Sequence, residues 1–166
     1  MNIEITKAGG DDLRYVQDLS ERVLPDTFYG VLTTEQIDYM LDKLYSQDAI
    51  RQEHDRDDHR YLIARADGER SGYALIIRQG PDLFFLPKIY VEENRRSRGV
   101  GTALIRRVIA LVRESHPGPF TIEVKLNRHN RARAFYAKLG FVKIREEMTE
   151  IAEDIAISQE VFALTV

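Results

Sequence analysis

Hydrophobic and polar positions along the chain change period several times, and this pattern predicts an α/β protein. Short alternating or β-branched runs are typical of strands, whereas apolar residues that recur every three or four positions predict amphipathic helices. The resulting order of elements is β, α, α, β, β, β, α, β, α, β, β. The strands are expected at residues 2–7, 60–66, 71–78, 83–91, 120–126, 141–145 and 155–166.

Individual residues predict where several helices and strands begin or end. The first helix is expected to end near Pro25, because proline ends or kinks a helix. Thr33 and Gln36 have the spacing of a capping box, which predicts the start of the second helix. The charged residues 51–60 have no apolar period and are expected to form a solvated helix end or loop, and residues 146–154 a polar connection.

Proline at position 87 interrupts the strand predicted at residues 83–91. Proline has no N–H group to donate to a sheet ladder, so it is expected on an edge strand or at a bulge. A bulge at this point would separate the strand from its neighbour. The pattern therefore predicts either an edge strand or a splayed pair of strands.

The composition is that of an ordinary globular protein of 166 residues, which favours one domain over residues 1–166. The chain has no cysteine, so a disulfide framework, a thiolate metal site and a cysteine nucleophile are excluded. The four histidines lack the spacing of metal ligands, and no metal site is expected. No apolar run is long enough to span a membrane, and there is no N-terminal signal pattern. These features predict a cytoplasmic protein.

The net charge of −3 conceals an uneven distribution, because acids outnumber bases in residues 1–60 and bases outnumber acids in residues 61–166. A basic part suits a polyanionic cofactor and an acidic part could attract a cationic acceptor, although both could equally be solvated surface. Arg128, Arg131 and Arg133 lie close together in the sequence, but no stacking aromatic residues accompany them. A nucleic-acid partner is therefore not expected.

Residues 95–102 connect the strand at 83–91 to a helix and have the composition of a phosphate-binding turn. They include Arg95, Arg96, Arg98, Gly99 and Gly101. Glycine lets backbone N–H groups approach a ligand, a helix N-terminus adds unpaired donors, and arginine adds charge. A Walker loop or a Rossmann fingerprint would need a different spacing. The turn predicts a polyphosphate site, with a glycine-kinked helix start and solvated arginines as the alternative.

Two segments carry a family resemblance. Arg96-Ser97-Arg98-Gly99-Val100-Gly101 resembles the Arg/Gln-x-x-Gly-x-Gly/Ala motif of the GNAT acyltransferase superfamily. Residues 127–141, which contain Phe-Tyr and then Lys-Leu-Gly-Phe, resemble its second signature. Residues 145–154 are more weakly similar to bacterial polyamine-acetyltransferase-like members. The resemblance implies the GNAT fold, a mixed and mostly antiparallel sheet with a splayed strand pair and helices on both faces. It also implies acetyl-coenzyme A as cosubstrate and no metal.

The resemblance further implies which residues bind the cofactor. The backbone of Ile89, Tyr90 and Val91 would pair with the pantetheine arm. The turn would hold the pyrophosphate through backbone N–H groups and the Arg96 side chain. This turn comprises Arg96, Ser97, Arg98, Gly99, Val100, Gly101 and Thr102. Asn130 would bond the pantetheine, and Lys138 or nearby arginines could meet the ribose phosphate. Asn130 precedes the Tyr136 position by six residues, where seven is frequent in the family.

Tyr136 is the residue that the resemblance assigns as general acid toward the leaving coenzyme A thiolate. The alternative is a core tyrosine, because Tyr136 shares an apolar stripe with Phe135. Many members carry an acid on the strand before the pyrophosphate turn, but residues 84–88 contain no carboxylate. Glu123 on the next strand is then the candidate base, unless strand alternation leaves it on a solvated face. An ordered water chain could also remove the proton.

The predicted function is transfer of an acetyl group from acetyl-coenzyme A to a primary amine, by direct attack through a tetrahedral intermediate. The acceptor should be lined by the first two helices and the closing strands. Their acids favour a cationic polyamine or a peptide amine; these are Asp18, Glu21, Asp26, Glu35, Asp38 and Asp42. The alternative is a non-catalytic regulatory module that binds acyl-coenzyme A. A homodimer paired through the C-terminal strands is compatible with either function.

Overall fold

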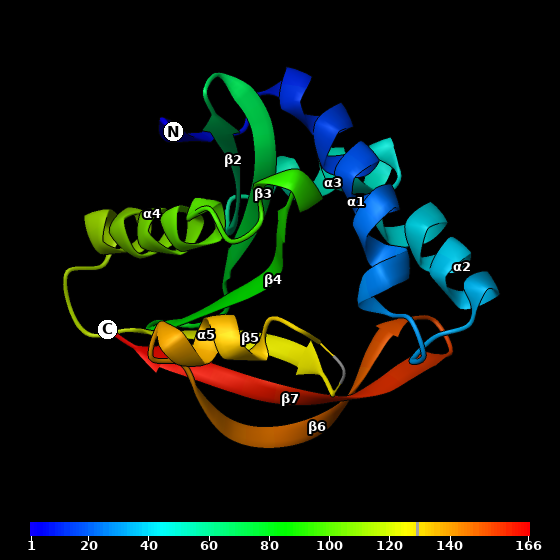
Figure 1. Cartoon of the computed structure of the whole chain (residues 1–166). Helices are drawn as coiled ribbons and strands as arrows, with labels where there is room; N and C mark the ends of the chain where they lie inside the picture. Colours follow the sequence, from blue (N-terminus) through cyan, green and yellow to red (C-terminus); the bar gives the residue numbers. More distant parts are fainter. Residues whose placement is uncertain (129) are drawn as a thin grey trace.

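A computed structural model describes residues 1–128 and 130–166 and contains one seven-stranded sheet in the order β1-β2-β3-β4-β5-β7-β6 (Figure 1). The strands are β1 (Ile3–Lys7), β2 (His59–Ala66), β3 (Glu69–Arg78), β4 (Leu83–Val91), β5 (Thr121–Asn127), β6 (Val142–Ala152) and β7 (Ile155–Thr165). The helices are α1 (Leu13–Thr27), α2 (Thr34–Leu44), α3 (Gln47–His54), α4 (Val100–Ser115) and α5 (Arg133–Lys138), with 3-10 turns at Gly10–Asp12 and Glu93–Arg95.

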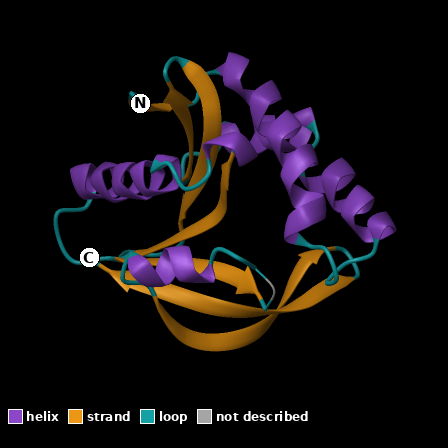
Figure 2. Cartoon of the chain, viewed as in Figure 1, coloured by secondary structure: helices purple, strands orange, loops and turns teal. Residues whose placement is uncertain are grey.

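The sheet is mixed and mostly antiparallel, as the family resemblance implies. Only β4 and β5 run parallel, and they pair over just three residues on each strand, Leu83 to Phe85 with Thr121 to Glu123. Beyond Phe85 the two strands separate, which is visible in the centre of Figure 2. Every other pair of neighbouring strands is antiparallel. The predicted splayed strand pair is therefore confirmed.

Pro87 lies where β4 leaves β5. β4 stands between β3 and β5 in the sheet, but at Pro87 it no longer pairs with β5, so the proline has a locally open strand edge. The register between β3 and β4 shifts between Leu75 and Ile77, opposite the proline. Proline cannot donate to the ladder, and the bulge accommodates this. The bulge thus marks the point at which the sheet opens.

Helices cover both faces of the β1-to-β4 part of the sheet. Leu62 and Ala64 of β2 pack on the face covered by α4, whereas Tyr61 and Ile63 pack under α1 and α3. This follows from the two-residue period of a strand, which sends successive side chains to opposite faces. All four residues are at most 2% exposed, so β2 is buried on both sides.

A third cluster joins the N-terminal helices to the C-terminal strands. Phe28 after α1, Ile37 and Met40 of α2, and Ile155 and Ile157 of β7 pack together. Each buried side chain of this size contributes roughly 1.5–3 kcal/mol. The cluster holds α1 and α2 over the far end of β7, and so closes the space between the separated strands from one side.

Two predicted helix boundaries agree with the structure and one strand boundary does not. The charged residues 51–60 begin with the end of α3, as predicted, although α3 itself was not predicted as a separate helix because it has only one fully buried side chain, Ile50. The first helix ends near Pro25 as predicted, because the proline lies in the last turn of α1 and the helix stops at Thr27. Residues 146–154 are not a polar connection, because β6 continues to Ala152 as an edge strand with charged side chains.

Candidate active site

A cavity of about 1430 Å³ occupies the space where β4 and β5 separate. Its walls come from α1, α2, β4, the turn before α4, β5, α5 and the two C-terminal strands. The second half of β4 pairs with β3 only, so its other backbone edge faces this space. The cavity combines an open strand edge with a helix N-terminus, which a bound chain with an anionic end could use together.

The β4 residues predicted to contact the pantetheine arm lie at the cavity. Ile89, Tyr90 and Val91 all line it. Gly72 of β3 pairs with Val91 and lets the two strands approach closely, since a Cβ atom on Gly72 would lie 2.6 Å from the carbonyl oxygen of Tyr90. The absence of a side chain at Gly72 therefore fixes the position of this strand edge.

The turn after β4 has a backbone shape suited to an anion. Ser97 and Gly99 both have positive φ angles, +62° and +91°, and α4 begins directly afterwards at Val100. Left-handed residues next to a helix N-terminus turn successive N–H groups toward one side, which forms an anion-binding concavity. Positive φ is easy for glycine and costly for most other residues, which explains Gly99.

The turn residues divide into two groups by position. Arg96, Ser97, Gly99, Gly101 and Thr102 line the cavity. The side chain of Val100 is buried in the core under α4, and Arg98 is exposed outside the lining. These last two residues were predicted to contribute their backbone N–H groups, a role that does not require their side chains to face the cavity.

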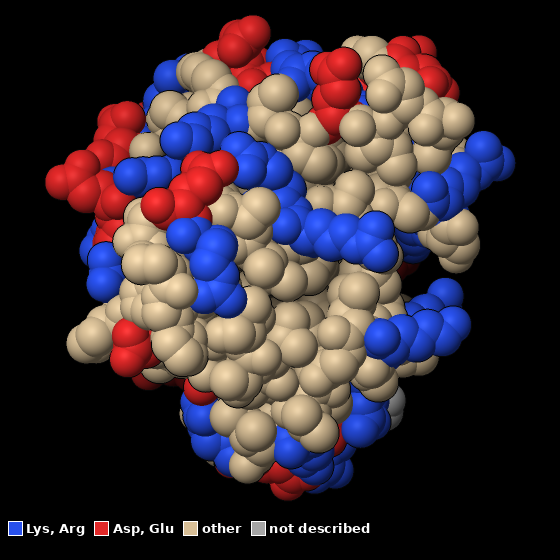
Figure 3. Space-filling model, turned by 90° about the vertical axis from the view of Figure 1, so that its left-hand side faces the viewer, with Lys and Arg blue, Asp and Glu red and all other residues tan. Residues whose placement is uncertain are grey.

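The arginines of the turn have different partners. Arg95 is bound to Glu69 at 3.1 Å and lies 3.9 Å from Asp67, so it ties the turn to the β2–β3 hairpin. Arg96 is only loosely held, with Nε donating to the carbonyl oxygen of Val91 at 3.4 Å. On the face of the molecule that carries α4, Lys and Arg side chains stand on both sides of a notch (Figure 3). Positive charge is therefore available to an anionic ligand.

Gly101 allows α4 and α5 to approach each other. A Cβ atom at Gly101 would lie 3.1 Å from Cζ of Phe135, closer than nearly all real contacts of this kind. The second glycine of the motif thus lets the N-terminus of α4 pack against the ring that precedes Tyr136. The two predicted signatures, far apart in the sequence, meet at this contact.

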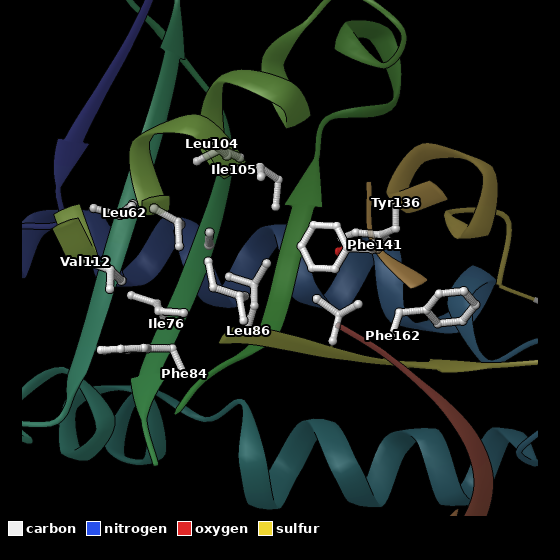
Figure 4. Packing of buried hydrophobic residues seen from close by; sticks show 14 of the residues in the cluster. Leu62, Ile76, Phe84, Leu86, Leu104, Ile105, Val112, Tyr136, Phe141 and Phe162 are labelled. Carbon is white, nitrogen blue, oxygen red and sulfur yellow. The ribbon is translucent and has the colours of Figure 1, made fainter. Parts of the chain in front are cut away.

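Tyr136 lines the cavity but is only 2% exposed. Its ring packs edge-on against Phe135 and Phe141, with ring centroids 5.1 and 5.2 Å away, and Figure 4 shows it beside Phe141. Burial raises the pKa of the Tyr136 hydroxyl well above its ordinary value, so the phenol stays protonated at neutral pH. The residue thus belongs to the core and to the cavity wall at once.

Asn130 and Lys138 take different positions. Asn130 lines the cavity, and its Oδ1 atom accepts a hydrogen bond from the N–H of Ala132 at 2.8 Å. Lys138 is exposed at the end of α5 and is not part of the lining. His129, which occupies the spacing frequent in the family, lies outside the described residues.

The structure does not bring Glu123 to the cavity. Glu123 lies in the part of β5 that still pairs with β4, opposite Phe85. Its carboxylate is buried and accepts hydrogen bonds from Arg145 at 2.9 and 3.4 Å. Both carboxylate oxygens are thus engaged by Arg145, away from the cavity lining.

The sequence predicts that the acceptor lies where α1, α2 and the C-terminal strands line the cavity, and we call this part the acceptor end. It is less acidic than the sequence suggests. Of the six acids on α1 and α2 that were singled out, only Asp26 lines the cavity. Two lysines also line this end, Lys88 and Lys125. Lys125 is 2.8 Å from Glu147.

Lys88 is a buried site residue that sequence reasoning missed. It is 8% exposed, and its Nζ atom is 2.9 Å from Oε1 of Glu53 and 3.3 Å from the hydroxyl of Tyr61. The same ammonium lies 4.1 Å from the ring centroid of Tyr45. Burial lowers the pKa of Lys88 below its ordinary value, while Glu53 acts in the opposite direction. The sequence signal that could have identified it is a single lysine within the otherwise apolar strand at residues 83–91.

Gln159 is the second residue that was missed. It is 8% exposed and lines the cavity from the floor formed by β5, β6 and β7. Its signal in the sequence is a polar residue between Ile157 and Val161, which are both buried and share its side of the strand. A buried polar residue at an apolar position indicates a structural or ligand contact.

The described residues lack the features of a membrane-spanning helix and of a metal-binding cluster. None of the helices is long and apolar enough to cross a membrane. Across the same residues, no group of three or more His, Cys, Asp or Glu side chains is arranged to hold a metal ion.

Comparison with known families identifies the class of protein. The acetyltransferase (GNAT) domain model matches residues 29–152, which is most of the chain. The chain therefore belongs to the GNAT acetyltransferase family. This confirms the resemblance seen in the two sequence signatures, while the similarity to polyamine acetyltransferases stays a prediction.

Curated relatives include an uncharacterized N-acetyltransferase of Mycobacterium tuberculosis. It is 36% identical over 81 residues, which are 48% of this chain and 51% of that protein. The chain thus matches about half the length of these relatives. A probable N-acetyltransferase of the same organism is 28% identical over 150 residues, covering 84% of this chain and 80% of the relative.

Solved structures share the fold at low sequence identity. PaiA N-acetyltransferase from Thermoplasma acidophilum, in complex with coenzyme A, has a TM-score of 0.79 at 20% identity and covers 98% of both chains. Ard1 from Thermoplasma volcanium has a TM-score of 0.74 at 17% identity, covering 100% of this chain and 99% of that one. These likenesses establish the GNAT fold.

Proposed function

We propose that the protein is an N-acetyltransferase that moves an acetyl group from acetyl-coenzyme A to a primary amine. The observation that carries this proposal is the continuous path from the open edge of β4 to the anion-binding turn at the start of α4. Both lie on one cavity. The PaiA structure, which shares the fold, is a complex with coenzyme A.

The residues present fit the cofactor. The turn from Arg96 to Gly101 would hold the pyrophosphate with backbone N–H groups and the Arg96 guanidinium. The free edge of Ile89 to Val91 would pair with the amide groups of the pantetheine arm, and Asn130 would bond the same arm. When bound, acetyl-coenzyme A supplies an activated thioester. Lys138 is proposed only as a contact of the peripheral ribose phosphate, because it lies outside the cavity lining.

Tyr136 is the proposed general acid. Its hydroxyl is protonated at neutral pH because burial raises its pKa, and its position in the wall directs it to the same space as the β4 edge. A positioned phenol can give its proton to the departing thiolate. Removal of the amine proton is assigned to water in the cavity, since Glu123 is bound by Arg145 away from the lining.

The competing function is a module that binds acyl-coenzyme A without turnover. One assay distinguishes the transferase from the binding module. It measures release of the free coenzyme A thiol from acetyl-coenzyme A with a panel of amines. Calorimetry with acetyl-coenzyme A runs in parallel. Release with an amine supports the transferase, binding without release supports the module, and absence of binding rejects both. A cytoplasmic location and a homodimer through the C-terminal strands remain predictions.

A further inference from the structure

Gln159 places its side-chain amide at the acceptor end of the cavity. The residue is 8% exposed, lines the cavity, and makes no side-chain hydrogen bond to the residues that the structure describes. Its amide atoms are not among the fully enclosed polar atoms that lack a partner, so the amide is open to the cavity. A ligand in the cavity that both donates and accepts hydrogen bonds can therefore pair with it.

A second unpaired group lies on the neighbouring strand. The Oγ1 atom of Thr149 is enclosed and has no hydrogen-bond partner within the described part of the chain. Thr149 also lines the cavity, and it pairs with Ile157, two residues from Gln159 on the same side of β7. The two side chains are thus diagonal neighbours on the cavity floor, within about 7–8 Å of each other by ordinary sheet geometry.

The third polar residue of this floor holds the helix above it. Asn127 of β5 is directly opposite Gln159 in the sheet and donates from Nδ2 to the carbonyl oxygen of Thr27 at 3.1 Å. This bond joins the end of α1 to the floor. The apolar part of the lining at this end comes from Phe28, Met40, Leu44 and Ile151.

The chemistry of Gln159 discriminates between classes of amine. A glutamine side chain offers two N–H donors and one carbonyl acceptor. A peptide or primary amide group carries both an acceptor and a donor, so it can satisfy both ends. An ammonium group only donates and a carboxylate only accepts, and either would leave one end of Gln159 unpaired. Lys88 and Lys125 in the same lining are each paired with a glutamate, so they add no net charge that would select a polycation.

We propose that the acceptor is the α-amine of a peptide or amino-acid amide with an apolar first side chain, and that Gln159 and Thr149 recognise the amide that follows the amine. The inference rests on the proposed acetyltransferase function and names its substrate class. The apolar side chain would lie against the wall that includes Phe28 and Met40. Gln159 is therefore a specificity residue, and it takes no part in proton transfer.

The test uses two acceptors that differ in the amide alone, leucinamide and 3-methylbutylamine, with spermidine as a third. The ratio of kcat/KM for leucinamide to that for 3-methylbutylamine is measured in the wild type and in Gln159→Leu. Differences in amine basicity cancel when the two proteins are compared. Loss of the amide contact should lower this ratio about tenfold, as expected for one to two hydrogen bonds.

Matched variants isolate the effect. Thr149→Val keeps the shape of the side chain and should lower the same ratio about threefold to tenfold, which also provides the test if Gln159→Leu does not fold. Ser158→Ala, next to Gln159 but exposed, should leave it unchanged. Acetyl-coenzyme A affinity should be equal in all of these proteins.

The outcomes separate this inference from the proposed function. A lowered ratio with unchanged cofactor affinity supports it. An unchanged ratio in both Gln159→Leu and Thr149→Val overturns it, as does a wild type that prefers spermidine to leucinamide. Cofactor binding without turnover of any of the three amines overturns it as well. The proposed function itself is rejected by absence of acetyl-coenzyme A binding, or by absence of thiol release with every amine of the wider panel.

Discussion

The Nζ atom of Lys88 lies 2.9 Å from Oε1 of Glu53, an ion pair that joins β4 to α3 behind the acceptor end of the cavity. The lysine side chain is 9% exposed and the glutamate 25%. Lys88 follows Pro87, so this pair acts on β4 just beyond the bulge at which the strand leaves β5. We infer that the ion pair helps to hold the open strand edge in place.

Removal of the glutamate should therefore destabilise the fold. Glu53→Ala leaves a buried ammonium without its counter-charge, and a loss of about 3 kcal/mol in the free energy of unfolding is expected. Urea denaturation at neutral pH measures it. The double variant Glu53→Ala/Lys88→Met should recover most of the loss. As a control, Asp42→Ala removes an exposed acid whose nearest cation is 3.9 Å away, and should change stability by less than about 0.5 kcal/mol.

A pH-dependent contribution is expected from Glu92. Its carboxylate accepts hydrogen bonds from Arg22 at 2.6 and 2.9 Å and from the hydroxyl of Tyr15 at 2.9 Å, which ties α1 to the turn after β4. The hydrogen bonds from Arg22 are the largest cause that lowers the pKa of Glu92 below its ordinary value of 4.5. A lowered folded-state pKa stabilises the protein above the unfolded value, and this is lost as the pH falls through the folded value.

The difference in unfolding free energy between the wild type and Glu92→Gln should thus be largest above about pH 5 and shrink below about pH 4. Urea denaturation over this range provides the measurement. Glu150→Gln, an exposed acid with no ion pair among the described residues, serves as the reference variant. A difference that stays constant down to acidic pH would contradict the assignment.

Gly72 should tolerate no side chain. An added Cβ atom would meet the carbonyl oxygen of Tyr90 at 2.6 Å and Cα of Val91 at 3.2 Å, both backbone atoms. Gly72→Ala is expected to lose about 1–3 kcal/mol of stability and to weaken acetyl-coenzyme A binding, because β4 must shift at its cavity edge. Gly10→Ala, which has no neighbouring atom within 4 Å and no positive φ, is the matched control and should bind normally.

The parts of the molecule that the sequence predicted well depend on local signals. Gly99 and Gly101 at a helix start, and Pro87 inside a strand, each restrict the backbone at their own position. The splayed strands and the turn at the cavity follow from those restrictions. The order of elements was likewise readable, except for α3, because most strands and helices have a clear apolar period.

The parts that were missed depend on long-range pairing. Whether Glu123 faces the cavity is set by where β4 stops pairing with β5 and by Arg145, which comes from another strand. The burial of Lys88 depends on Glu53 of α3 and on two tyrosines distant in the sequence. Residues 146–154 appeared polar because an edge strand needs no apolar alternation when ion pairs cover it.

The role of Glu123 can be decided directly. Glu123→Gln removes the charge opposite Arg145, and a stability loss of about 1 kcal/mol is expected, since Arg145 is 44% exposed. Turnover should stay within about twofold of the wild type, because the carboxylate lies outside the cavity lining. A decrease of about 100-fold or more in kcat would instead restore Glu123 as the general base.

Tyr136→Phe tests the chemistry most closely. The hydroxyl forms no hydrogen bond to the described residues, and the ring contacts with Phe135 and Phe141 survive the substitution. Stability and acetyl-coenzyme A affinity should therefore persist, while turnover falls at least about tenfold, within the range that general acid catalysis contributes. Tyr39→Phe, outside the cavity lining, controls for the loss of a hydroxyl elsewhere. Unchanged turnover in Tyr136→Phe would leave the tyrosine a packing residue and require another source for the proton.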